Sequence, residues 1–148
     1  MRGVEPSFHC KRFADLTPTE LYGLIRLRVD VFVVEQQCPY AELDGRDAEP
    51  GTCHLWYAEE GVIVAYLRTL VEADGTSIGR VVTAPGARSR GLARVLITHA
   101  LEQMDLARPV HIGAQAHLEG WYAKSGFVAA GPEYDEDGIP HLPMRLDS

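Results

Sequence analysis

The chain has 148 residues, 46% of them hydrophobic, and a formal net charge of −7 at pH 7. This length suits one domain with its own core, so we expect a single domain over residues 1–148. The acidic balance disfavours nucleic acid and anionic membrane surfaces as partners but attracts cationic amines. The longest apolar run, residues 62–67, is too short to span a bilayer, and the start lacks a secretory signal, which predicts a cytoplasmic protein.

The first half of the chain predicts a helix followed by an antiparallel meander. Thr17 and Glu20 have capping-box spacing around Pro18, and apolar residues recur behind them at helical spacing, so a helix begins near Pro18. Three runs of strand-forming residues joined by short glycine turns follow, at residues 54–59, 62–71 and 76–83.

A turn with two arginines connects the third strand to the next predicted helix. Its residues are Arg88, Ser89, Arg90, Gly91, Leu92 and Ala93, and helical apolar spacing continues behind them. The first N–H groups of a helix lack intrahelical partners and lie at the positive end of its dipole. Guanidinium groups beside them can add bidentate contacts. The pattern predicts a phosphate-binding turn.

The charges around this turn favour the same interpretation. Residues 75–101 contain no Asp or Glu but four arginines, within an acidic chain. The glycine spacing of residues 86–91 matches a P-loop, yet Leu92 and Ala93 stand where that loop needs Lys and then Ser or Thr. A nucleoside triphosphate is therefore not the predicted ligand. The alternative is a solvated helix start that is rich in arginine.

The C-terminal third adds a strand at residues 110–114, a short helix at 118–125 and two final strands around an acidic loop at 133–137. Because a helix joins the strand at 76–83 to the strand at 110–114, these two strands should be parallel. The sequence therefore predicts an α/β fold with a mixed, mainly antiparallel sheet and helices on both faces.

No metal site is expected. The cysteines are odd in number and widely spaced, without a Cys-x-x-Cys pair, which predicts reduced thiols rather than disulfides or a zinc site. The six histidines show no ligand-like pairing.

Two motifs resemble those of the GNAT N-acetyltransferase superfamily. Arg88, Gly91 and Ala93 match the Arg/Gln-x-x-Gly-x-Gly/Ala pattern of its motif A. Gln115 and Tyr122 have the spacing of the Asn and Tyr in its motif B, with Gln in place of Asn, and a Gly-Phe pair follows as in the family. Residues 28–40, 114–118 and 137–141 are similar to the ElaA-like subgroup, and the resemblance covers residues 21–144.

This resemblance implies a fold and a donor. In GNAT proteins the turn holds the pyrophosphate of acetyl-CoA, the preceding strand offers backbone groups to the pantetheine arm, and two parallel strands splay apart to admit it. Carried onto this sequence, the residues that contact acetyl-CoA would be Val81, Val82, Thr83, Arg88, Ser89, Arg90, Gly91, Leu92, Ala93 and Gln115.

The resemblance further implies direct transfer of an acetyl group to a primary amine of a small molecule or peptide. Tyr122 matches the family's general acid, which protonates the departing CoA sulfur. For the general base the sequence offers Glu35 and His141, each of which also has a purely structural interpretation. Three further carboxylates are interpreted as an acidic rim that attracts the acceptor: Glu42, Asp44 and Asp47.

Two alternatives remain open at this point. An interaction module could bind acyl-CoA without turnover, since a fold does not prove catalysis. An acyl-homoserine-lactone-type synthase shares the fold, but its acyl-carrier surface should be basic, whereas this chain is acidic. The acceptor is not determined, and an exposed final strand offers an edge for a possible homodimer.

Overall fold

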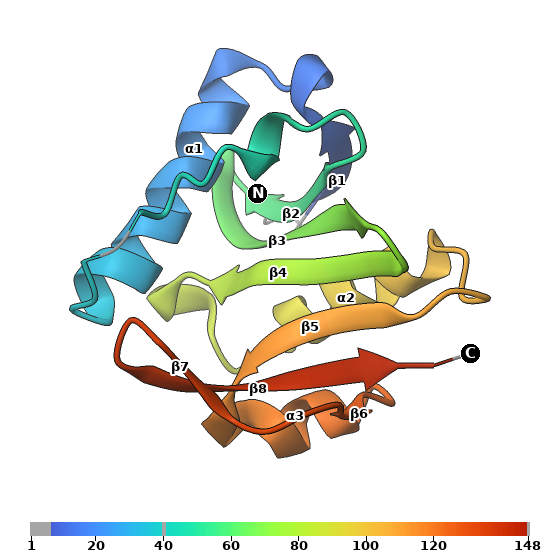
Figure 1. The fold of residues 1–148 in the computed structure, drawn as a ribbon. Coiled ribbons are helices and arrows are strands. Elements are labelled where there is room, and N and C mark those ends of the chain that lie inside the picture. Colours follow the sequence, from blue (N-terminus) through green and yellow to red (C-terminus); the bar gives the residue numbers. More distant parts are fainter. Residues whose placement is uncertain (1–6, 40, 148) are drawn as a thin grey trace.

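The computed structural model describes residues 7–39 and 41–147, which form an eight-stranded sheet (Figure 1). The strands are β1 (Ser7–Arg12), β2 (Cys53–Glu59), β3 (Val62–Glu72), β4 (Gly75–Thr83), β5 (Val110–Gln115), β6 (Val128–Ala129), β7 (Tyr134–Glu136) and β8 (Ile139–Leu146). The α-helices are α1 (Pro18–Arg28), α2 (Leu92–Glu102) and α3 (Glu119–Ala123). Three parts of the chain lie outside the described residues: residues 1–6, on which the expectation about a secretory signal rests, Tyr40 in the ElaA-like stretch, and Ser148.

The sheet is mixed, as the sequence predicts. Its order is β1-β2-β3-β4-β5-β8-β6, with β7 pairing with β8 beside this path. Only β4 and β5 pair in parallel within the described chain, and α2 connects them. Among the described residues, no helix is both long and apolar enough to cross a membrane.

Helices cover both faces of the sheet (Figure 1). Neighbouring residues of a strand face opposite sides, so Trp56 and Tyr66 point toward α1 while Leu55 and Leu67 point toward α2. The α1 side buries Leu24, Leu27, Val31, Trp56, Tyr66 and Val82. The opposite side buries, among others, Leu55, Leu67, Ile78, Leu96, Ile97, Tyr122 and Phe127. Each such side chain stabilises the fold by about 1.5–3 kcal/mol through burial.

The N-terminus of α1 carries the predicted capping box. The Thr17 hydroxyl accepts a hydrogen bond from the Glu20 N–H at 3.1 Å, and the Glu20 carboxylate accepts one from the Thr17 N–H at 2.9 Å. Pro18 takes the first helical position, where no N–H is needed. A π-helical segment, Val29–Glu35, continues α1. This segment extends the helix to the edge of the sheet at which the candidate site lies.

The parallel strands β4 and β5 separate soon after they meet. They pair at Thr76–Val110, Ser77–His111 and Ile78–Ile112, and beyond these positions β5 pairs only with β8 within the described residues. A bulge accompanies the separation, because Arg80 and Val81 together lie opposite one residue of β3. Arg80 has a φ of 52°, and a bulge of this kind bends its strand. The splayed parallel pair implied by the resemblance is therefore present.

The C-terminal prediction needs correction. The expected acidic loop at 133–137 is mostly strand β7, which forms a tight hairpin with β8. The dipeptide Asp137-Gly138 makes its turn, with φ values of 53° and 83°, as two-residue hairpin turns require. The predicted helix at 118–125 begins as a 3-10 turn and continues as α3, and Gly126 follows with a φ of 98°. Strand β1 was not predicted.

Replacing Thr17 with Ala should lower the free energy of unfolding by about 1 kcal/mol, because an orphan N–H of α1 loses its acceptor. Urea denaturation followed by circular dichroism measures the change. Thr19→Ala, at an exposed position two residues later, is the matched control and should cost little. Equal effects of the two substitutions would contradict the role of the capping box.

Candidate functional site

A cleft of about 590 Å³ lies where β4 and β5 separate. Its walls come from β4, from the end of β5 with the helix α3 behind it, from the π-helical segment, and from the β7–β8 hairpin. Nine of the predicted site residues line it: Glu35, Val81, Val82, Thr83, Arg88, Ala93, Gln115, Tyr122 and His141. The other four, Ser89, Arg90, Gly91 and Leu92, belong to the adjoining turn but do not line the cleft.

The turn before α2 leaves backbone donors available. Ser89 and Gly91 have φ values of 67° and 76°, and Gly91 is the N-cap of α2. Within the described residues, no side chain caps this helix. Its first N–H groups therefore keep their capacity to bind an anion beside Ala93, which lines the cleft.

Both arginines of the turn are paired with carboxylates. Two N–H groups of Arg88 donate to the two carboxylate oxygens of Glu35, each at 2.7 Å. Arg90 binds Glu59 in the same bidentate way. The hydrogen bonds from Arg88 lower the pKa of Glu35 below its usual range. Glu35 is thus held as a carboxylate against a cation, which makes it a weak proton acceptor.

Tyr122 lies in α3 and its ring is buried between two aromatic neighbours. Its centroid is 4.9 Å from that of Trp121 and 6.3 Å from that of Phe127, both edge to face. Arg94 holds this helix by stacking 4.2 Å from the Trp121 ring and donating to its carbonyl at 2.7 Å. Burial raises the pKa of Tyr122 to about 12. The phenol is therefore protonated at neutral pH, and Tyr122 lines the cleft.

His141 and Gln115 occupy opposed positions of β8 and β5. The His141 Nδ1–H donates to the Ile139 carbonyl at 2.8 Å, and Nε2 lies 3.4 Å from a carboxylate oxygen of Glu136. The Gln115 amide donates to Gln36 at 3.4 Å, which joins the end of β5 to the segment after the π-helix. Of the two base candidates, Glu35 is paired with a cation, whereas the Nε2 atom of His141 faces a carboxylate.

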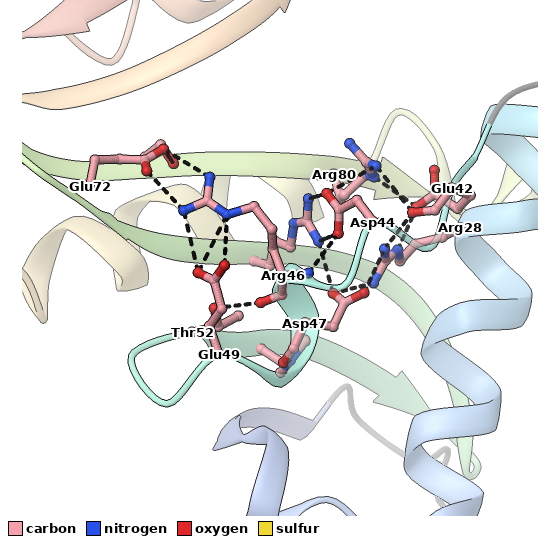
Figure 2. Close-up of polar contacts among 12 residues, drawn as sticks. Arg28, Glu42, Asp44, Arg46, Asp47, Glu49, Thr52, Glu72 and Arg80 are labelled. Carbon is pink, nitrogen blue, oxygen red and sulfur yellow. Dashed lines mark hydrogen bonds and ion pairs between the residues drawn. The ribbon is translucent and has the colours of Figure 1, made fainter.

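A cluster of buried ion pairs, rather than an acidic rim, fills the region beside the cleft (Figure 2). One carboxylate oxygen of Glu42 accepts from Nε of Arg28 at 2.6 Å and from Nε of Arg80 at 2.8 Å. Asp47 accepts from Arg28 at 2.7 Å and from Arg68 at 3.0 Å. Arg28 comes from α1, Arg68 from β3 and Arg80 from the bulge of β4.

The predicted acidic rim is therefore wrong for Glu42 and Asp47, whereas Asp44 is exposed and paired with Arg68. Glu42 is 4% exposed and Asp47 8% exposed, because the three arginines bring the loop down onto the sheet. Burial alone would raise the pKa of Asp47, but the hydrogen bonds and positive charges of Arg28 and Arg68 together outweigh burial, and the pKa is lowered. Hydrogen bonds from Arg68 likewise hold the pKa of Asp44 well below its usual range.

The cluster extends to β2 through His54, which is fully buried. Its Nε2–H donates to the Asp47 carbonyl at 3.0 Å, so Nδ1 accepts the hydrogen bond from the Tyr66 hydroxyl at 2.6 Å. Burial lowers the pKa of His54, which keeps the ring neutral. On the other side, Arg46 donates to Glu49 and Glu72 (Figure 2). Sequence analysis missed these partners, although polar residues inside apolar strands were a signal for them.

Comparison with known proteins decides the family. The profile of the family described as Acetyltransferase (GNAT) domain matches residues 15–148. The chain belongs to the GNAT family. An acyl-CoA N-acyltransferase from Pseudomonas aeruginosa is 45% identical with a TM-score of 0.90, and the match covers 96% of this chain and 99% of that one. ElaA from Escherichia coli (strain K12) is 38% identical over 140 residues, which covers 90% of this chain and 92% of ElaA. The crystal structure of Escherichia coli ElaA superimposes with a TM-score of 0.89 and 34% identity, covering 97% of this chain and 100% of that one.

The predicted resemblance to ElaA-like GNAT proteins is thus confirmed. The predicted fold is confirmed as well, since the mixed sheet with its one parallel pair is the GNAT arrangement. GNAT membership is consistent with acyl transfer from CoA, and the acceptor is not identified.

Replacing Asp47 with Asn should destabilise the protein by about 3–5 kcal/mol, because Arg28 and Arg68 would keep buried charge without their shared carboxylate. Urea denaturation at pH 7 measures this loss. Asp30→Asn is the control, since Asp30 pairs with Arg26 at the exposed surface at 3.7 Å and should matter little.

The pH dependence of stability gives a second test of the role of Asp47. The folded pKa of Asp47 is depressed, so its contribution is complete above the unfolded pKa of about 3.9 and is lost as pH falls further. Asp47→Asn should therefore show a shallower loss of stability with acid than the wild type. An Asp47→Asn protein that unfolds like Asp30→Asn would disprove the anchoring role of the cluster.

Proposed function

We propose that the protein transfers an acetyl group from acetyl-CoA directly to a primary amine of a small molecule or peptide. The observation that carries this proposal is the cleft at the separation of β4 and β5, where the arginine turn and Tyr122 meet. Its volume of about 590 Å³ is that of an ordinary ligand site. The Pseudomonas aeruginosa relative is named an acyl-CoA N-acyltransferase, which supports the same donor class.

The residues around the cleft fit the parts of acetyl-CoA. The N–H groups from Ser89 to Ala93 and the guanidinium groups of Arg88 and Arg90 would hold the pyrophosphate. Past Ile78, the edge of β4 has no partner in β5, so its backbone groups at Val81, Val82 and Thr83 can bind an extended arm. Gln115 faces the same space from the end of β5. The turn and strand together therefore suit a long, anionic donor.

The chemical step follows from these positions. The amine nitrogen attacks the thioester carbon and forms the C–N bond, and backbone N–H groups near Val82 would stabilise the resulting oxyanion. The C–S bond then breaks, and the thiolate takes a proton from the Tyr122 hydroxyl, which burial keeps protonated at neutral pH.

The two base candidates take different roles in this proposal. Glu35 holds the guanidinium of Arg88 in line with the turn and is a weak base while paired with it. His141 presents its Nε2 lone pair on the hairpin side of the cleft, and we assign it the removal of the amine proton.

Arg88→Ala should weaken acetyl-CoA binding by about 10- to 100-fold, the value of one charge-assisted contact, and the loss should shrink at high salt. Isothermal titration calorimetry measures the dissociation constant. Arg26→Ala removes an exposed arginine of α1 and serves as the control. Unchanged binding in Arg88→Ala would remove the turn from the donor site.

Tyr122→Phe should lower kcat by about 10²- to 10⁴-fold while acetyl-CoA still binds, because only proton donation is lost. Thiol release from acetyl-CoA, followed with a disulfide dye over a panel of primary amines, reports the rate. Tyr57→Phe is the control, since the Tyr57 hydroxyl contacts His99 away from the cleft. Full activity of Tyr122→Phe would show that its hydroxyl does not supply the proton. Binding without any thiol release in the wild type would instead favour the interaction module.

A further inference from the structure

The imidazole of His141 is held with one nitrogen fixed and the other available. The residue is 9% exposed and lies in β8, where it lines the cleft. Its Nδ1 lies 2.8 Å from the Ile139 carbonyl oxygen, and a carbonyl oxygen only accepts hydrogen bonds. Nδ1 therefore carries the hydrogen, and Nε2 of the neutral ring has a free lone pair.

This lone pair faces a carboxylate. An oxygen of Glu136 lies 3.4 Å from Nε2. The Nε2 lone pair and the carboxylate oxygen are both hydrogen-bond acceptors, so they need a hydrogen between them. That hydrogen can be a proton on Nε2 or an N–H group of a ligand that contacts both atoms. The Glu136 side chain is 58% exposed, whereas the His141 side chain is 11% exposed. The pair thus has one member inside the cleft and one member in contact with solvent.

The hairpin keeps the pair in place. In the register of β7 with β8, Tyr134 lies opposite His141, and its ring stacks on the imidazole with centroids 5.7 Å apart. Tyr134 reaches this position across Gly113, where a Cβ would lie 2.6 Å from its hydroxyl. At the hairpin turn, the Asp137 carbonyl accepts from the Cys38 thiol at 3.1 Å. The turn is thereby tied to the segment that follows the π-helix.

We propose that Glu136 and His141 receive the acceptor amine in its ammonium form, with Glu136 pairing with the charge and His141 removing the proton. This inference rests on the proposed function and names its acceptor class. The acceptors would be aliphatic primary amines, which are cationic at neutral pH with a pKa of about 10, rather than weakly basic amines. Glu136 was not among the site residues that the sequence indicated.

The proton steps balance. An N–H bond of the ammonium breaks and an Nε2–H bond forms, which makes an imidazolium that Glu136 stabilises. The freed lone pair forms the C–N bond, and the electron pair of the C–S bond leaves with sulfur, which takes the Tyr122 proton. The phenolate regains a proton from the new amide nitrogen. The imidazolium proton passes to solvent, so each turnover releases one proton.

The titratable groups around His141 come from every element packed against it. Tyr134 and Glu136 of β7 contact the ring, and the other ionisable groups that line the same cleft are Glu35, Cys38, Arg80, Arg88, His117, Tyr122 and Asp137. Among these groups, Glu136 is the carboxylate that lies within ion-pair distance of the His141 ring. Its neutralisation should therefore remove the partner of the ammonium charge and lower kcat/KM for a cationic amine.

The test compares two amines of similar size with acetyl-CoA as donor. Ethylamine is protonated at pH 7 and needs a base, whereas trifluoroethylamine is already neutral. His141→Gln should lower kcat/KM for ethylamine by about 100-fold or more, and Glu136→Gln by about 10-fold. Both variants should act on trifluoroethylamine almost as the wild type does. Glu133→Gln, an exposed carboxylate three residues earlier, is the control and should leave both reactions unchanged.

Each outcome of these experiments supports or overturns the proposed roles of Glu136 and His141. Equal losses with both amines would show that His141 only supports the hairpin and would overturn the inference while acetyl transfer stands. Long-range ¹H–¹⁵N spectra of the His141 ring give a readout without turnover, in which the neutral ring should carry its hydrogen on Nδ1. A neutral ring with its hydrogen on Nε2 would also overturn the inference. Absence of thiol release by the wild type with any primary amine would contradict the proposed function itself, and the inference with it.

Discussion

The site depends on a backbone constraint. Two parallel strands that pair at three positions and then separate leave N–H and C=O groups without ladder partners, and such groups need partners of another kind. The bulge at Arg80 and Val81 makes the separation part of the fold, because it bends β4 while β5 continues along β8. The resulting cleft is therefore a place where an extended ligand can complete the sheet's hydrogen bonding.

Buried charge holds the wall of this cleft in position. Arg80 would be costly to bury alone, but it shares a carboxylate oxygen of Glu42 with Arg28, so the bulge of β4, the loop at 41–48 and helix α1 are tied together. Removing one partner from such a cluster leaves an uncompensated charge, which makes its members interdependent. The π-helical segment continues directly from α1, so the same contacts orient the wall that carries Glu35.

The cleft has two chemically different sides. The turn before α2 supplies guanidinium groups and N–H groups that no described side chain caps, and its arginines are paired with Glu35 and Glu59. The hairpin supplies carboxylates around a buried imidazole. A single cleft can thus favour an anionic donor at one side and a cationic acceptor at the other. Tyr122, with its raised pKa, lies in the wall between them.

The sequence alone determined the features that depend on neighbouring residues. The capping box at Thr17, the glycine that starts α2 and the parallel crossover each follow from local spacing and turn chemistry, and motif matches gave seven of the nine predicted residues that line the cleft. Only the tertiary structure decided which charges meet. Glu42 and Asp47 are buried partners of arginines rather than an exposed rim, and Glu35 pairs with an arginine 53 positions away. The physical reason is that the basicity and exposure of a carboxylate depend on the groups that folding brings beside it. The order of residues along the chain does not give the distances between such groups.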